Sequence, residues 1–221
     1  MNKLFNPDST LMVALSKMTD MVFLSVLWFV CSLPIITIGP ATAAMYYITL
    51  KWARGEDVKL ASGFFHAFKD NFKQGVVMNL IFLVVGGILF WDYVFMGAVE
   101  GTGAMLSSVC FLVMGIWMLC IMFYAYPLQA QFYNPIKRTL MNAAILSMRK
   151  IVTTVIVFGL NMLPVIVMFV FPNLFLRLIP VWALVTPGVV ATICGKIFAK
   201  LFDPYLKPAD AETAEPEQEE E

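Results

Sequence analysis

Charged residues are scarce in this sequence, and five long stretches contain none. Only 14% of the 221 residues are charged, whereas 60% are hydrophobic and the mean hydropathy is +0.81. The uncharged windows are 21–50, 74–91, 101–136, 151–176 and 178–195. Each is long enough to cross about 30 Å of hydrocarbon as an α-helix. The strict apolar/polar alternation of membrane barrels is absent, so the sequence predicts an all-α, polytopic integral membrane protein.

Residues that usually carry enzyme chemistry are also few. The single histidine, His66, has no cysteine near it, and the four cysteines lie in hydrophobic windows without a CxxC spacing. No GxxxxGK[ST], GxGxxG, HExxH or GxSxG motif occurs. We therefore predict a protein that is not an enzyme, with no catalytic residues, no cofactor and no metal site.

The acidic residues gather at the carboxyl end. From Asp203 onward there are eight acidic residues and one lysine, which leaves 14 basic against 7 acidic side chains in the rest of the sequence. The segment "PADAETAEPEQEEE" has no large apolar residue, which is typical of a solvated, disordered segment. The expected organisation is a helical membrane domain over residues 1–202 and an acidic disordered tail over 203–221. The basic residues lie where membrane topology requires them, so no nucleic-acid partner is expected.

The first uncharged window is thirty residues long, which is too long for one membrane helix of about 20 residues. It forms either one tilted span followed by an interfacial helix, or two short spans joined by a hairpin at Pro34–Pro40. Five spans place 12 basic residues inside and 3 outside, whereas six spans place 14 inside and 1 outside. This favours six spans in three hairpins with both termini cytoplasmic, and five spans remain the alternative. The six expected spans are 15–33, 36–52, 75–96, 104–126, 151–171 and 176–197.

The residues between the first two spans have the composition of a turn. Pro34 disfavours helix in the residue before it, and Pro40 suits the first turn of a new helix. Gly39 is expected to take a positive φ, and the Thr37 hydroxyl is expected to cap the second helix.

Two basic segments lie between the expected hairpins. In "LASGFFHAFKDNFKQ", four phenylalanines fall on one arc of a helix and polar residues fall on the opposite side. In "FYNPIKRTLMNAAILSMRK", basic residues lie near both ends of a second helix. Both segments are predicted to be basic helices lying in the membrane interface.

Some polar residues lie inside the expected spans. Asp92 and Arg177 both fall toward outer ends, where a structural ion pair or interfacial snorkelling is favoured over a coupling role. Asn79, Asn161 with Pro164, and the run 186–188 could line a central cavity through unwound backbone. Hydrogen bonds between helices and helix kinks are the favoured interpretation of these positions.

One part of the sequence resembles a known family. The stretch "LWFVCSLPIITIGPATAAMYYITLKWARGED" and the following "FFHAFKDNFKQG" are similar to the YesL-like family of bacterial integral membrane proteins, whose function is unknown. The similarity covers residues 20–80 well, and beyond them only the hydrophobic rhythm and "YPLQAQF" agree. Family members are often encoded beside carbohydrate ABC transporters in Gram-positive bacteria. The resemblance therefore implies a multi-pass protein of the bacterial plasma membrane with an accessory part in sugar uptake or sensing, and it brings no site residues.

Two functions follow as hypotheses. The first is a non-enzymatic accessory or regulatory component associated with ABC-type carbohydrate uptake. The alternative is a small transporter for a sugar or another neutral solute. The expected partners are the lipid bilayer together with a carbohydrate ABC transporter or further copies of the chain.

Overall fold

The computed structural model describes residues 10–206, and it describes the side chains of Met12 and of residues 15–206. Every described secondary-structure element is helical, which confirms the all-α prediction. Of the tail expected over 203–221, residues 203–206 belong to the last helix, and the residues from 207 onward lie outside the described residues. The elements are α1 (Thr10–Cys31), η1 (Ile35–Thr37), α2 (Ile38–Ala53), α3 (Leu60–Asp70), α4 (Phe72–Gly97), α5 (Thr102–Gln131), α6 (Ile136–Arg149), α7 (Ile151–Val170), α8 (Pro172–Arg177), α9 (Ile179–Leu184) and α10 (Thr186–Leu206).

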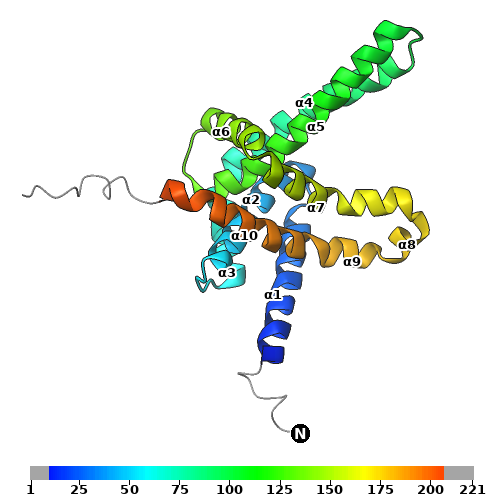
Figure 1. Cartoon of the computed structure of the whole chain (residues 1–221). Coiled ribbons are helices and arrows are strands. Elements are labelled where there is room, and N and C mark those ends of the chain that lie inside the picture. Colours follow the sequence, from blue (N-terminus) through cyan, green and yellow to red (C-terminus); the bar gives the residue numbers. More distant parts are fainter. Residues whose placement is uncertain (1–9, 207–221) are drawn as a thin grey trace, which may run out of the picture.

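The short helix α2 lies at the centre of the molecule (Figure 1). It packs against α1, α3, α4, α5 and α10, and ten of its residues are buried. Small residues such as Ala41, Ala43 and Ala44 dominate its first half, and they allow neighbouring helices to approach closely. The sequence of α2 thus suits a helix that is covered by protein on all sides.

Glycines make the closest helix contacts. A Cβ atom at Gly39 of α2 would collide with the backbone oxygen of Gly75 in α4, and one at Gly195 of α10 would come within 2.8 Å of the Thr49 side chain in α2. The prediction of a positive φ at Gly39 is wrong, because among the described residues only Gly55 and Gly101 have one. Gly39 is instead required by the contact between α2 and α4.

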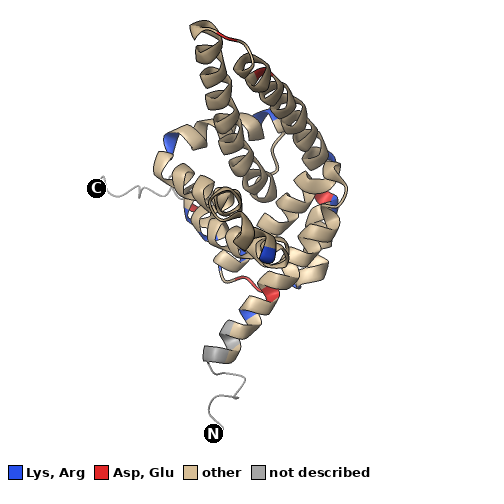
Figure 2. Ribbon diagram, turned by 90° about the vertical axis from the view of Figure 1, so that its right-hand side faces the viewer, with Lys and Arg blue, Asp and Glu red and all other residues tan. Residues whose placement is uncertain are grey.

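Two helical arms extend from this centre (Figure 1). The first is the α4–α5 hairpin, and the second runs through α7, α8 and α9. Large apolar side chains on the arms are exposed, as at Phe90 (68%) and Phe169 (77%), which is the surface expected of helices in contact with lipid. In Figure 2, the part of the α4–α5 arm beyond its base shows charged residues only toward its far end. The sequence has Asp92 near the end of α4 and Glu100 between α4 and α5.

Among the described residues, three helices, α4, α5 and α7, are long and apolar enough to cross a membrane. The membrane-type fold is therefore supported, but the count of six spans is not confirmed. The expected second span corresponds to α2, whose 16 residues measure about 24 Å and fall short of the hydrocarbon thickness. The expected sixth span, 176–197, is divided among α8, α9 and the first half of α10.

The two expected interfacial segments do form helices, α3 and α6. The aromatic face of α3 packs largely inward, because Phe64 is fully buried and Phe68 packs against the core that contains it. Phe65 remains 46% exposed, and Phe72 belongs to α4 because a break at Asn71 separates the two helices. The prediction that all four phenylalanines face the membrane surface is therefore wrong for Phe64.

Candidate functional site

A cavity of about 280 Å³ lies between the central helix and the bases of both arms. It is bounded by residues of α1, α2, α4, α5, α7, α9 and α10, and no charged side chain is among its described lining residues. Aromatic rings supply much of the wall, and amides and hydroxyls supply the polar groups. The aromatic lining residues are Trp28, Tyr46, Phe123, Tyr126 and Trp182, and the polar ones are Thr42, Asn79, Asn161 and Thr186.

The α1–α2 turn forms one edge of this cavity, through Ile38. Pro34 is extended, with φ −74° and ψ 121°, and it precedes η1. Pro40 lies in the first turn of α2, as its sequence context predicts, and both Gly39 and Pro40 are buried. The turn is therefore exposed over residues 33–36 and buried at Thr37, Gly39 and Pro40.

The Thr37 hydroxyl closes the turn in an unexpected direction. Its Oγ1 lies 2.6 Å from the carbonyl oxygen of Cys31 and 2.7 Å from that of Pro34, to which it donates. No side-chain hydrogen bond caps the amino end of α2, so the capping prediction for Thr37 is wrong. The hydroxyl instead satisfies carbonyl groups left free where α1 ends.

Asn79 connects the turn to two arm helices. Its Nδ2 donates to the carbonyl oxygen of Ile35 over 2.8 Å, and its Oδ1 accepts from the Tyr126 hydroxyl over 3.2 Å. Asn79 is buried and belongs to α4, whereas Tyr126 belongs to α5. The favoured interpretation of Asn79, a hydrogen bond between helices, agrees with this geometry, and the same residue also lines the cavity.

Asn161 and Trp182 present unpaired polar atoms at the opposite wall. The Asn161 Nδ2 donates to the Val157 carbonyl oxygen over 2.8 Å and lies 3.8 Å from the Cys194 Sγ in α10. Its Oδ1 has no hydrogen bond to the described part of the chain. The Trp182 Nε1–H is buried and also lacks a described partner. One acceptor and one donor are thus free on residues that line the same cavity.

A break between two helices lies beside this wall. Helix α9 ends at Leu184 and α10 begins at Thr186, next to Pro187, which also lines the cavity. The Gly188 N–H donates to the Ser25 Oγ over 2.8 Å, and this bond attaches the start of α10 to α1. The break between α9 and α10 therefore lies directly at the cavity.

Asp92 and Arg177 lie away from the cavity. Asp92 is half-buried on the α4–α5 arm, whereas Arg177 is exposed at the end of α8 in the other arm. The ion pairs formed by the described residues do not include one between them. The two residues thus occupy separate arms, and the structure does not join them into one site.

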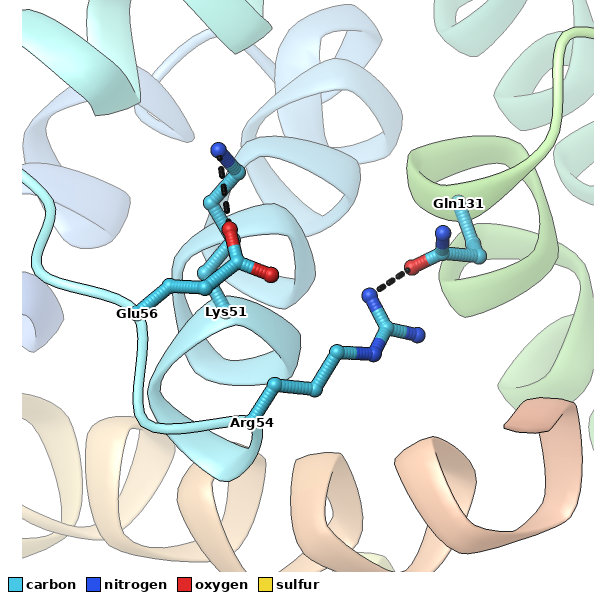
Figure 3. Close-up of polar contacts among 4 residues, drawn as sticks. All are labelled: Lys51, Arg54, Glu56 and Gln131. Carbon is cyan, nitrogen blue, oxygen red and sulfur yellow. Dashed lines mark hydrogen bonds and ion pairs between the residues drawn. The ribbon is translucent and has the colours of Figure 1, made fainter. Parts of the chain in front are cut away.

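A polar junction that the sequence reasoning missed joins the ends of α2 and α5 (Figure 3). The Arg54 Nη1 donates to the Gln131 Oε1 over 2.9 Å, and its Nε lies 3.8 Å from the Asp203 Oδ1 of α10. Nearby, the Lys51 Nζ lies 3.3 Å from the Glu56 Oε2. The sequence does contain a signal for this junction, because charged residues follow directly after the uncharged window that ends at Leu50.

Comparison with known proteins finds similarity in the first part of the chain. Residues 21–93 match the model of a family described as "Protein of unknown function, DUF624". Over 74 residues the chain is 36% identical to the protein of Bacillus subtilis (strain 168) named "Uncharacterized protein YesL". Residues 21–93 therefore resemble the YesL-like family, and they are referred to below as the YesL-like segment. The aligned region covers 32% of this chain and 35% of that relative, and no solved structure matches the chain.

The YesL-like segment contains the turn, the central helix α2 and most of α4. It therefore includes Thr37, Gly39, Asn79, Arg54 and the α2–α4 contact. Asn161, Trp182 and the α9–α10 break lie beyond it. The cavity is thus built from one wall inside the YesL-like segment and one wall outside it.

Proposed function

We propose that this chain is a non-enzymatic membrane protein that binds a small uncharged solute in the central cavity. The observation that carries this proposal is the lining: aromatic walls, no charged residue among the described lining residues, and one acceptor on Asn161 and one donor on Trp182 without a described partner. Small-molecule sites are typically apolar cavities with a few convergent polar groups. An unpaired buried N–H is costly, so a ligand that accepts from it is favoured.

Size and charge narrow the ligand class. A volume of about 280 Å³ holds the equivalent of roughly nine water molecules, each with a share of about 30 Å³. An ion would lose its hydration without gaining an opposite charge, which is strongly unfavourable. A ring with one apolar face and several hydroxyl groups, as in a monosaccharide or cyclic polyol, would pack on the aromatic walls and pair with Asn161 and Trp182.

The amides, indoles and hydroxyls of the cavity are poor general acids and bases near neutral pH, which supports a binding role over a catalytic one. We place the protein in the bacterial plasma membrane as an accessory or regulatory component of ABC-type carbohydrate uptake. This placement rests on the YesL-like resemblance. The apolar α4–α5 arm is the surface proposed to contact the transporter or a second copy of the chain.

A transporter for a neutral solute is the second candidate. The observation that favours it is the interruption between α9 and α10 beside the cavity, since broken helices at binding sites are common in secondary transporters. In this case the chain alone moves solute, whereas an accessory component binds solute without moving it.

The binding proposal is tested with the purified full chain in detergent, titrated with uncharged sugars and polyols and with their charged acid and amine counterparts. We expect uncharged ligands to raise the melting temperature and charged ones to leave it unchanged. Trp182→Phe keeps the ring and removes the donor, so it should weaken binding roughly two- to tenfold. Trp117→Phe, on the exposed surface of α5, is the matched control.

Equal binding by Trp182→Phe and by the unmodified chain would contradict the assigned site, as would binding of none of the uncharged ligands. Flux measured in reconstituted vesicles and co-purification from native membranes then separate the two roles. Flux by the chain alone identifies a transporter. Co-purification with a carbohydrate ABC transporter and no flux identifies the accessory component.

A further inference from the structure

A second cavity, of about 330 Å³, lies where α1, α10 and the connection between α2 and α3 meet. It is distinct from the central cavity, and the two share no lining residue. Its wall is rich in charge of both signs. The lining residues are Lys17, Asp20, Met21, Trp52, Gly55, Glu56, Asp57, Thr192 and Lys196.

The cavity lies where charged and uncharged parts of the sequence meet. Three ends of uncharged windows fall here: one window begins at Met21 in α1 and ends just before Lys51 in α2, and another ends just before Lys196 in α10. Met21, Trp52 and Lys196 all line the cavity, so the three boundaries meet at one level of the molecule. Tryptophan is enriched at the membrane–water boundary of membrane proteins. A lipid headgroup, which joins a charged part to apolar chains, would suit such a boundary.

The lining has two basic and three acidic residues, and one of the acidic ones is already paired. Glu56 is already paired with Lys51, at 3.3 Å. Of the other charged lining residues, Lys17, Lys196, Asp20 and Asp57 form no ion pair with the described part of the chain. Two ammonium groups and two carboxylates thus remain available. Such a set favours a ligand that carries one charge of each sign over one with a net charge.

We infer that this cavity binds a zwitterionic headgroup that combines a phosphate ester with a primary ammonium, as in phosphatidylethanolamine. Lys17 and Lys196 pair with the phosphate, and Asp20 and Asp57 accept hydrogen bonds from the ammonium group. Lys17 and Asp20 are three residues apart in α1 and therefore share one face of the helix. The acyl chains would lie along the exposed apolar side of α1, where Phe23 is 45% exposed.

The carboxylates give the site its selectivity. A primary ammonium has three N–H donors for Asp20 and Asp57, whereas the quaternary ammonium of a choline headgroup has none. A glycerol headgroup has no positive charge to meet the carboxylates, and its net negative charge faces them. The lining is therefore expected to bind the ethanolamine lipid more tightly than either the choline lipid or the glycerol lipid.

The experiment uses the purified full chain in detergent and three phospholipids with the same acyl chains and ethanolamine, choline or glycerol headgroups. Lipid retention is measured by native mass spectrometry, and the melting temperature is followed in parallel. We expect the ethanolamine lipid to be retained best. Asp57→Asn and Lys196→Gln should each weaken this retention about two- to fivefold, the size typical of a partly exposed ion pair. Lys200→Gln, one turn further along α10 and outside the lining, is the matched control.

The sharpest variant is the double substitution Asp20→Asn with Asp57→Asn, which leaves the two lysines in place. It should reverse the preference toward the glycerol lipid, because the free charge of the lining becomes positive. The inference is overturned if the unmodified chain retains choline or glycerol lipid equally well, or if the double variant keeps its preference for ethanolamine. Competition by soluble phosphoethanolamine would show that the headgroup alone suffices. Retention of the lipid without such competition would show that the anchored lipid is the ligand.

Discussion

A single methyl group added at Gly39 tests whether the contact between α2 and α4 determines the stability of the fold. A Cβ atom there collides with the backbone oxygen of Gly75 and lies 3.0 Å from the Asn79 Cβ. The first of these atoms is backbone and the second is the root of a side chain, so neither can turn aside as the end of a flexible side chain can. The substitution Gly39→Ala must therefore push the two helices apart.

The expected size of this effect follows from two opposing terms. Overpacking a close contact costs about 1–3 kcal/mol, whereas alanine is favoured over glycine in a helix by about 1 kcal/mol. Separation of the helices also weakens the hydrogen bond from Asn79 to Ile35, which is worth about 0.5–1.5 kcal/mol. A net loss of about 2 kcal/mol lowers the melting temperature by about 4–8 °C in a chain of this size.

Gly87→Ala is the matched control, because a Cβ atom at this α4 position meets nothing within 4 Å. It should leave the melting temperature unchanged or raise it slightly. The assay is thermal unfolding of both variants in the same detergent, followed by tryptophan fluorescence and size-exclusion chromatography. Gly75→Ala, whose Cβ atom would lie 2.7 Å from the Pro40 nitrogen, should reproduce the loss from the other helix. If Gly39→Ala melts at or above Gly87→Ala, the reasoning is refuted.

Thr37→Val should lower stability by about 1 kcal/mol, since it removes the hydroxyl that closes the turn, whereas Thr37→Ser should melt close to the unmodified protein. Asn79→Ala should cost about 1–3 kcal/mol because it breaks two interhelical hydrogen bonds, and an unchanged melting temperature would contradict this network. Phe64→Ala should cost about 3–5 kcal/mol as a fully buried ring, and a loss below 1 kcal/mol would show that α3 is not packed on the body. In a cysteine-free background, a cysteine at Gly101 should react with an impermeant reagent added from outside and one at Ser62 should not, and the opposite pattern would reverse the proposed orientation.

Features that depend on neighbouring residues, such as helix ends, could be predicted from the sequence. Pro34 and Pro40 predicted where one helix ends and the next begins, because proline restricts backbone angles wherever it occurs. Contacts between residues far apart in the sequence could not be predicted from it. Asn79 meets a carbonyl 44 residues before it and a hydroxyl 47 residues after it, and no local pattern specifies such partners.

The errors have the same origin. Helical spacing placed Phe64 on an apolar face, but that spacing does not say whether lipid or α2 covers the face. Gly39 was assigned a backbone role because it follows a turn, whereas the actual constraint is Gly75 in another helix. Asn161 was recognised as an unusual polar residue, but its position across the cavity from Asn79 depends on how five or more helices pack.

The hydrogen bond between Gly188 and Ser25 joins residues that are 163 positions apart, and it has a consequence for biogenesis. The α4–α5 hairpin pairs neighbouring helices and can form as soon as both have left the ribosome. Ser25 on α1 and Thr49 on α2 must instead wait in the bilayer until α10 is synthesised. During translation the contacts of α10 with α1 and α2 are therefore the last to form. A chain that stalls before α10 leaves the α10-facing surfaces of α1 and α2 uncovered, where the membrane's quality-control machinery can recognise them.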